Sequence, residues 1–233
     1  MIAIYVKEMK QYFHSMIGYI FLTIMLLISG FLFTSGNLMS QNGDIRTFFA
    51  SLFNILIFII PMLTMRQFSE ERKLKTLQLL FTLPLSVGST VLGKFLAILS
   101  ITGIGLSVTL IYPVILAFFG SFALMVTLGN YLGIILLVSS ISALGLFIST
   151  LTENQVVSAI TSYGVILILW LVDSLAPYAG SPILKRILNL FSLKGNYIEF
   201  SYGILNPASI LYFLSLTALF LILSIISLES RRQ

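Results

Sequence analysis

Long, uninterrupted apolar stretches run through the chain, with short polar segments between them. Six stretches approach or exceed the roughly 20 residues that an α-helix needs to cross a bilayer, whereas a β-barrel would show segments of about 10 residues with alternating polarity. Only helices and closed barrels satisfy their backbone hydrogen bonds in lipid, so the pattern predicts an all-α integral membrane protein. The predicted spans are Met16–Gly36, Phe48–Met65, Val91–Phe119, Leu128–Thr150, Val156–Val172 and Ser209–Leu228.

The third span, 91–119, is longer than a bilayer requires, so it must tilt, kink at Pro113 or extend into the interface. The connections outside the spans are too short or too apolar for a soluble domain, and no repeat is visible. Residues 1–233 therefore form a single transmembrane domain.

The segment before the first span has the spacing of an amphipathic helix. Its polar side carries Lys7, Lys10 and Gln11, and such a helix is expected to lie flat in the membrane interface. The apolar face consists of Ile2, Tyr5, Val6, Met9, Tyr12 and Phe13.

The connection before the last span, 173–208, is the longest. Pro182 begins a predicted helix, Gly195-Asn196 predicts a turn, and an aromatic patch follows. We expect an external re-entrant or interfacial hairpin. The apolar face of its helix is Ile183, Ile187, Leu190 and Phe191, and the patch is Tyr197, Phe200 and Tyr202.

Composition agrees with a membrane location, because only 9% of residues are charged and 58% are hydrophobic. Cytoplasmic loops of membrane proteins carry an excess of Lys and Arg. Placing both termini inside puts nine basic residues in the cytoplasm and four outside, which predicts an N-in, C-in topology. The net charge of +5 is then explained by topology and anionic lipid, without nucleic acid.

One segment between the second and third spans, FSEERKLKTLQLLFTLPLS at 68–86, gathers five charges. Ser69 can cap a helix with Glu70 and Glu71 in its first turn, Glu71 and Lys75 are spaced as i,i+4 partners, and Pro84 ends the helix. We predict an amphipathic helix over about 70–81 with an apolar stripe along one side. The stripe contacts lipid, the protein's own helices or a groove on a cytoplasmic protein, and the flanking ion pairs favour the groove. The stripe is Leu74, Leu77, Leu80 and Phe81.

No catalytic, cofactor-binding or metal site is predicted. Residues 88–94 match the first seven positions of a phosphate-binding loop, but Phe95 replaces the hydroxyl residue, no strand precedes the segment and Lys94 suits an interfacial anchor. The chain has one histidine and no cysteine, and its spans show no carboxylate pair.

Three features inside or between the spans remain. Asn54 is the polar side chain expected to lie deepest, either bonding to another helix or lining a substrate path. Gly129 and Gly133 permit close helix packing, which we assign to internal contacts rather than to a dimer face. The turn with Glu153 and Asn154 is either solvated or a contact for a partner.

Several motifs together resemble those of a known family, and with six spans and a long final loop they cover essentially the whole chain. They are Pro61-x-Leu63-Thr64-Met65-Arg66, Ser69-Glu70-Glu71-Arg72, Thr76-Leu77-x-Leu79-Leu80-x-x-x-Pro84-x-Ser86, Val91-Leu92-Gly93-Lys94-Phe95, Tyr212-Phe213-x-Ser215 and Ser227-Leu228-Glu229-Ser230-Arg231-Arg232. The chain thereby resembles type-2 ATP-binding-cassette (ABC) permeases, the membrane subunits of type V exporters, and among them the gliding-motility and copper-enzyme-maturation branch. It departs from them at Lys75, where relatives often carry glycine, and at Asn206-Pro207-Ala208, where many have an acidic residue or an Arg-Asp pair.

The resemblance implies a permease of a prokaryotic cell membrane that pairs with an identical or homologous permease and with two cytoplasmic ABC ATPases. These ATPases would bind ATP and Mg²⁺, and this chain would bind neither. Residues 70–80 would form a coupling helix in a cleft of the ATPase, with a second contact at Glu153 and Asn154. The coupling residues would be Glu70, Glu71, Arg72, Lys75, Thr76, Leu77, Leu80 and Phe81.

In the family, translocation runs between the two permeases, along spans one, two and five. Asn54 would line this path, and the apolar and aromatic residues on those spans suit export of a lipidic or amphipathic cargo; they include Phe53, Phe58, Tyr163 and Trp170. One alternative is a scaffold or mechanotransmitter that uses the ATPase to drive an extracytoplasmic accessory protein through 173–208. Another is a secondary transporter, which the lack of ionisable residues at mid-membrane disfavours.

Overall fold

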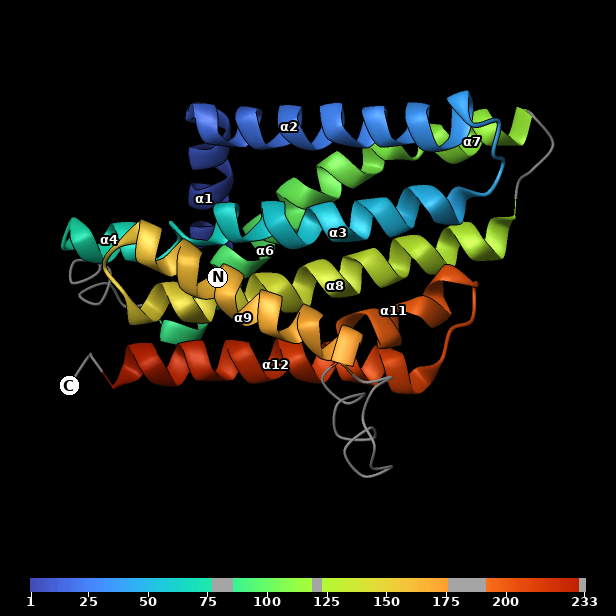
Figure 1. Cartoon of the computed structure of the whole chain (residues 1–233). Helices are drawn as coiled ribbons and strands as arrows, with labels where there is room; N and C mark the ends of the chain where they lie inside the picture. Colours follow the sequence, from blue (N-terminus) through green and yellow to red (C-terminus); the bar gives the residue numbers. More distant parts are fainter. Residues whose placement is uncertain (77–85, 119–122, 176–191, 231–233) are drawn as a thin grey trace.

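The computed structural model describes residues 1–76, 86–118, 123–175 and 192–230, and these form a helical bundle without strands (Figure 1). Six helical segments in this part of the chain are long and apolar enough to cross a membrane, which confirms the expected all-α architecture. They are Met16–Met39, Ile45–Lys73, Val87–Phe118, Leu124–Leu151, Gln155–Val172 and Pro207–Glu229.

Successive spans alternate in direction, so α1 and the last residues of α12 lie toward the same end of the bundle (Figure 1). We call this end, which also holds α4, the α4 end, and the opposite end the α11 end. The elements are α1 (Ile2–His14), α2 (Met16–Phe33), η1 (Thr34–Met39), α3 (Ile45–Thr64), α4 (Ser69–Lys73), α6 (Val87–Thr109), α7 (Ile111–Phe118), α8 (Leu124–Leu151), α9 (Gln155–Leu175), α11 (Leu193–Ser201) and α12 (Pro207–Glu229).

A break at Leu110 divides the long third span into α6 and α7. Pro113 has no backbone N–H, and its ring crowds the carbonyl four residues earlier, which belongs to Thr109. The helix is therefore interrupted about one turn before Pro113. Of the three possibilities for this span, the structure shows a kink.

Helix α8 forms the centre of the bundle and packs against α3, α6, α9, α11 and α12. In the most apolar stretch of α8, 78% of the residues are buried, whereas in the most apolar stretch of α9 only 17% are buried. Small residues permit this close packing. At Gly145, for example, an added Cβ would collide with the Thr64 side chain of α3.

Helix α11 packs against the first half of α8, where glycines leave room for it. A Cβ added to Gly133 would lie 2.8 Å from the Cβ of Phe200, and one added to Gly129 would lie 2.7 Å from the Phe200 carbonyl oxygen. The assignment of this glycine pair to internal packing is therefore confirmed.

The predicted turn at Gly195-Asn196 is wrong, because both residues lie within α11. The Ser192 side chain accepts a hydrogen bond from the Gly195 N–H at 2.8 Å and so caps the helix. Tyr197 and Phe200 of the expected aromatic patch are buried, whereas Tyr202 is exposed. The helix expected from Pro182 lies outside the described residues.

The most completely buried amide side chain among the described residues is Asn130 of α8, which the hydrophobic pattern of the sequence does not single out. It is fully buried, its Oδ1 accepts from the Tyr197 hydroxyl at 2.9 Å, and its Nδ2 donates to the Val126 carbonyl at 2.7 Å. Asn54 is instead exposed on α3 and donates to the Ala50 carbonyl. Burial depends on which face of a helix its neighbours cover, and the hydrophobicity of the sequence does not reveal that face.

Candidate functional site

Residues 69–73 of the charged segment form a short helix, α4, at the end of the span that contains α3. Glu70 and Glu71 occupy its first turn and Arg72 and Lys73 its last, the order that the helix dipole favours. Ser69 lies inside α4 rather than before it, and its hydroxyl donates to the Met65 carbonyl.

The predicted continuous helix over 70–81 is wrong within the described residues, because α4 ends at Lys73. Lys75 has a φ of 57°, the left-handed conformation that often terminates a helix. The Thr76 hydroxyl then donates to the Glu71 carbonyl, which secures the turn. Leu77, Leu80 and Phe81 of the predicted stripe lie outside the described residues. Leu74, its first member, is 64% exposed.

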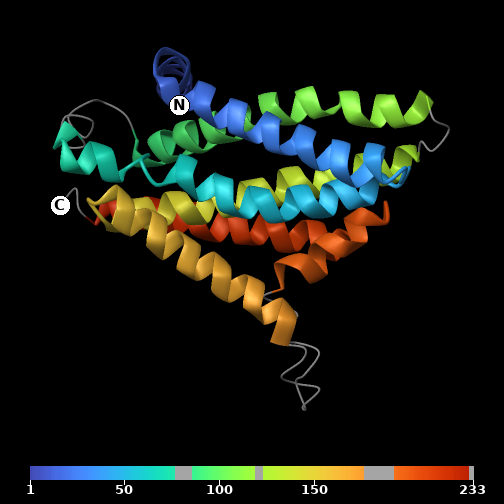
Figure 2. The ribbon, with the colours of Figure 1, turned by 45° about the horizontal axis from the view of Figure 1, so that its top comes forward.

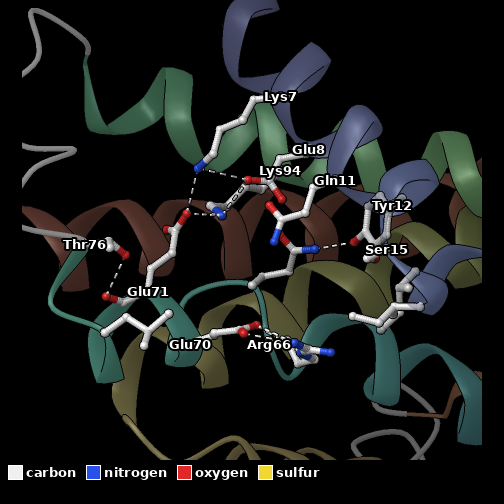
Figure 3. Close-up of a pocket in the computed structure, with 14 residues that line it drawn as sticks. Lys7, Glu8, Gln11, Tyr12, Ser15, Arg66, Glu70, Glu71, Thr76 and Lys94 are labelled. Atoms are coloured by element: carbon white, nitrogen blue, oxygen red, sulfur yellow. Dashed lines mark hydrogen bonds and ion pairs between the residues drawn. The ribbon is translucent and has the colours of Figure 1, made fainter.

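Lys94 of α6 lies at the centre of a buried ion cluster at the α4 end (Figure 3). Its Nζ donates to Glu8 of α1 and to Glu71 of α4, both at 2.9 Å. Lys7 adds a second bond to Glu71 at 3.1 Å, and the Phe68 ring lies 5.1 Å from the Lys94 Nζ. Lys94 is 2% exposed, so the expectation of an interfacial anchor is wrong.

Two other expectations change with this cluster. Glu71 pairs with Lys94 and Lys7, whereas its expected partner Lys75 follows the end of α4 and is exposed. The segment 88–94, which matched part of a phosphate-binding loop, lies in α6. Its backbone donors are therefore engaged in a helix rather than in a loop that surrounds a phosphate.

Helix α1 crosses the α4 end of the bundle almost perpendicular to the spans (Figures 1 and 2). Its buried residues are Ile4, Glu8 and Tyr12. Of the predicted apolar face, Tyr12 is buried and Tyr5 and Met9 pack partly buried against the core, whereas Ile2 and Val6 are exposed. Gly93 of α6 leaves room for Ile4. Burial raises the pKa of the Tyr12 hydroxyl, which accepts a hydrogen bond from the Gln67 amide. Helix α1 thus packs against other helices of the same chain, because Glu8 forms an ion pair with Lys94 of α6.

Arg72 connects α4 to the other side of the bundle. It donates to the Thr150 carbonyl at the end of α8 at 2.8 Å and to Glu153 in the following turn at 3.0 Å. The two proposed partner contacts, α4 and the turn at Glu153, are therefore neighbours. Arg66 holds Glu70 through bonds of 3.0 and 2.9 Å.

The predicted path residues divide into two groups. Asn54, Phe58, Tyr163 and Trp170 line an apolar groove of about 260 Å³ between α3 and α9, where the Tyr163 hydroxyl donates to the Phe58 carbonyl at 2.7 Å. Phe53 faces the other way: it is 2% exposed, and its ring lies 4.7 Å from that of Tyr197. The groove exists because α9 slants outward from the bundle (Figure 2).

Within the described ranges no group of three or more His, Cys, Asp or Glu side chains is arranged to hold a metal ion. A scan against models of known protein families finds no match to this chain. A search of curated proteins likewise finds no relative.

Proposed function

We propose that this chain is the permease subunit of an ATP-driven ABC exporter in a prokaryotic cell membrane, with both termini in the cytoplasm. Two copies of a cytoplasmic ATPase, which bind ATP and Mg²⁺, work with this chain and a second permease. ATP-driven closure of the ATPases shifts the permeases between inward-facing and outward-facing states.

The observation that carries the proposal is the attachment of α4. Ion pairs connect Glu71 to α1 and α6, and Arg72 connects to the end of α8 and the turn before α9. Residues 73–76 are nevertheless exposed at the end of the bundle. A partner that binds the exposed residues 73–76 would transmit force into the spans, because Glu71 and Arg72 just before them are bonded to other helices.

The conformation of Lys75 adds support. Its left-handed φ of 57° is one that glycine adopts without strain. The permease family that the chain resembles often carries glycine at this position. A glycine would adopt this backbone without strain, which supports the resemblance.

The groove between α3 and α9 supports the cargo path. Helix α9, which lines the groove, belongs to the least buried of the described spans within one chain, and closed two-fold assemblies are the commonest oligomers. A second permease against this face would enclose the groove, whose apolar lining suits a lipidic or amphipathic cargo. Substrate-stimulated ATP hydrolysis in vesicles tests the cargo class, and stimulation by hydrophilic solutes alone would refute it.

The docking proposal is tested with Leu74→Asp, which places a charge on the exposed residue directly after α4. We expect loss of ATPase co-purification while membrane insertion is unchanged. Leu205→Asp is the matched control, because Leu205 is 50% exposed at the α11 end. Equal ATPase recovery with both variants would overturn the proposal. Glu71→Arg is unsuitable, because it would break the buried ion cluster.

The second-permease contact is tested by cysteine cross-linking, since the chain has no cysteine of its own. Phe58→Cys should cross-link two permeases, whereas Ile135→Cys on the exposed face of α8 should not. Absence of any cross-link at Phe58 would contradict the shared path. Cargo movement in reconstituted vesicles separates an exporter from a scaffold that uses the same ATPase.

A further inference from the structure

A cavity of about 290 Å³ lies at the α4 end, between α1, the end of α3, α4 and the start of α6 (Figure 3). Helix α1 crosses the bundle here (Figure 1), and Ser15 and Ile17, where the first span begins, also line the cavity. The cavity thus lies where apolar spans give way to charged residues, which is the depth of lipid headgroups. Leu63 and Leu74 add apolar lining.

Three buried oxygen atoms of the cavity lining have no hydrogen-bond partner within the described part of the chain: Ser15 Oγ, Gln67 Oε1 and Glu71 Oε2. Gln67 is 6% exposed, so its free oxygen is held away from bulk solvent. An unsatisfied buried acceptor is unfavourable. Each of the three would accept a hydrogen bond from a donor in the cavity.

The charges around the cavity are balanced. Among the described lining residues, three are cations and three are carboxylates, so a ligand with a net charge would disturb the balance and a zwitterion would not. The cations are Lys7, Arg66 and Lys94, and the carboxylates are Glu8, Glu70 and Glu71.

We infer that this cavity binds the headgroup of a zwitterionic phospholipid with a primary ammonium, as in phosphatidylethanolamine. The ammonium has three N–H donors and no acceptor, which matches the three free oxygens. The phosphate is placed toward Lys7 and Arg66, whose side chains are 53% and 33% exposed. The first carbons of the lipid lie against Ile17, Leu63 and Leu74. This inference does not depend on the proposed transport function.

The number of N–H donors gives a direct test. The purified protein is titrated with phosphatidylethanolamine and its mono-, di- and trimethylated forms, and retained lipid is measured by native mass spectrometry. Each methyl group removes one donor, so affinity should fall by about three- to tenfold per step. Equal affinity for the first and last members would overturn the inference and leave a water-filled cavity.

Ser15→Ala sharpens the test, because Ser15 Oγ has no hydrogen-bond partner among the described residues. The variant should melt at the same temperature without lipid yet retain less phosphatidylethanolamine. Gln67→Met should weaken retention further, and Gln155→Met, at the start of α9, is the matched control. Unchanged retention in both cavity variants would contradict the assignment.

Three competitors show whether a lipid headgroup or another molecule supplies the ammonium group. Phosphoethanolamine without acyl chains should compete with the lipid only weakly, because it lacks the apolar contact. Phosphatidylglycerol should not compete, because it has no ammonium. Competition by a lysine-rich peptide that matches the lipid would instead assign the cavity to a basic side chain of a protein partner and overturn the lipid assignment.

Discussion

The two ends of the bundle bury polar side chains in different ways. At the α11 end, Asn130 has partners for both its amide nitrogen and its amide oxygen, and Glu199 accepts from Asn206 and Ser209 at the start of α12. At the α4 end, ion pairs connect three helices, and three buried oxygens around one cavity have no partner among the described residues, whereas at the α11 end this holds only for Asn37 Oδ1. The paired groups at the α11 end hold helices together, whereas the unpartnered oxygens around the cavity at the α4 end can still accept hydrogen bonds from a ligand.

Energetics supports this distinction. A satisfied neutral hydrogen bond adds modestly to stability, whereas a buried ion pair loses much of its attraction to the cost of desolvation. Stability alone therefore does not explain the cluster around Lys94. We propose a role in docking or binding for this cluster, and the substitutions below separate the two ends.

The largest expected effect is at the α4 end. Lys94→Met leaves Glu8 and Glu71 without their shared cation, and removal of one partner from a buried ion pair costs about 3–5 kcal/mol. Thermal unfolding in detergent should show a clear loss of stability, with Lys73→Met, an exposed lysine, as the control. Equal melting temperatures would mean that the cluster is hydrated rather than buried.

At the α11 end, Gly133→Ala tests close packing. Its Cβ would lie 2.8 Å from Phe200 Cβ, so we expect a loss of about 1–3 kcal/mol. Gly103→Ala is the matched control, because a Cβ there meets nothing within 4 Å. It should be neutral or slightly stabilising, and a similar loss in both variants would disprove the packing account.

Tyr197→Phe removes the donor to the buried Asn130 oxygen without changing shape. An unsatisfied buried acceptor costs about 1–3 kcal/mol, and interhelical bonds in membranes fall near the lower end. Tyr202→Phe, at an exposed position, should have no effect. A denaturation series of the two variants measures the difference, which should vanish if Asn130 takes up another partner.

Lys75→Gly should stabilise the protein by up to about 1 kcal/mol, because left-handed backbone costs non-glycine residues about 1–2 kcal/mol and glycine loses part of that gain in chain entropy. Lys73→Gly, within α4, should destabilise by about 1 kcal/mol. Opposite signs in the melting temperatures would support the turn after α4. A loss in both would show that α4 continues through Lys75.

The smallest effect is expected at Asp44, which caps α3. Burial would raise the pKa of Asp44, but hydrogen bonds from the Arg46 side chain and backbone outweigh it, and the pKa lies below its ordinary value of 3.8. A lowered carboxyl pKa stabilises the fold above the ordinary value and loses that contribution as the pH falls through the folded value. The difference in melting temperature between the parent protein and Asp44→Asn should therefore shrink below about pH 4. A constant difference would contradict the lowered pKa.

Part of the candidate site could be predicted from the sequence. Glu70, Glu71 and Arg72 stand out because five charges gather between two apolar spans. Glu8 and Lys94 were missed as partners, because they lie on helices far apart in the chain. Two signals were present: Glu8 lies four residues from both Ile4 and Tyr12, and Lys94 is the lone charge of a long apolar segment.

The sequence by itself determined the six apolar helices and marked Pro113 as the site of a kink if the third span bends, because transfer into lipid and proline sterics are local properties of a segment. Only the tertiary structure decided that Asn130 is buried and Asn54 exposed, that α1 buries Glu8, and that Lys94 lies between two carboxylates. These outcomes depend on which face of each helix its neighbours cover. In a chain that is apolar nearly throughout, hydrophobic periodicity distinguishes those faces poorly, so shape and charge pairing between distant helices choose them.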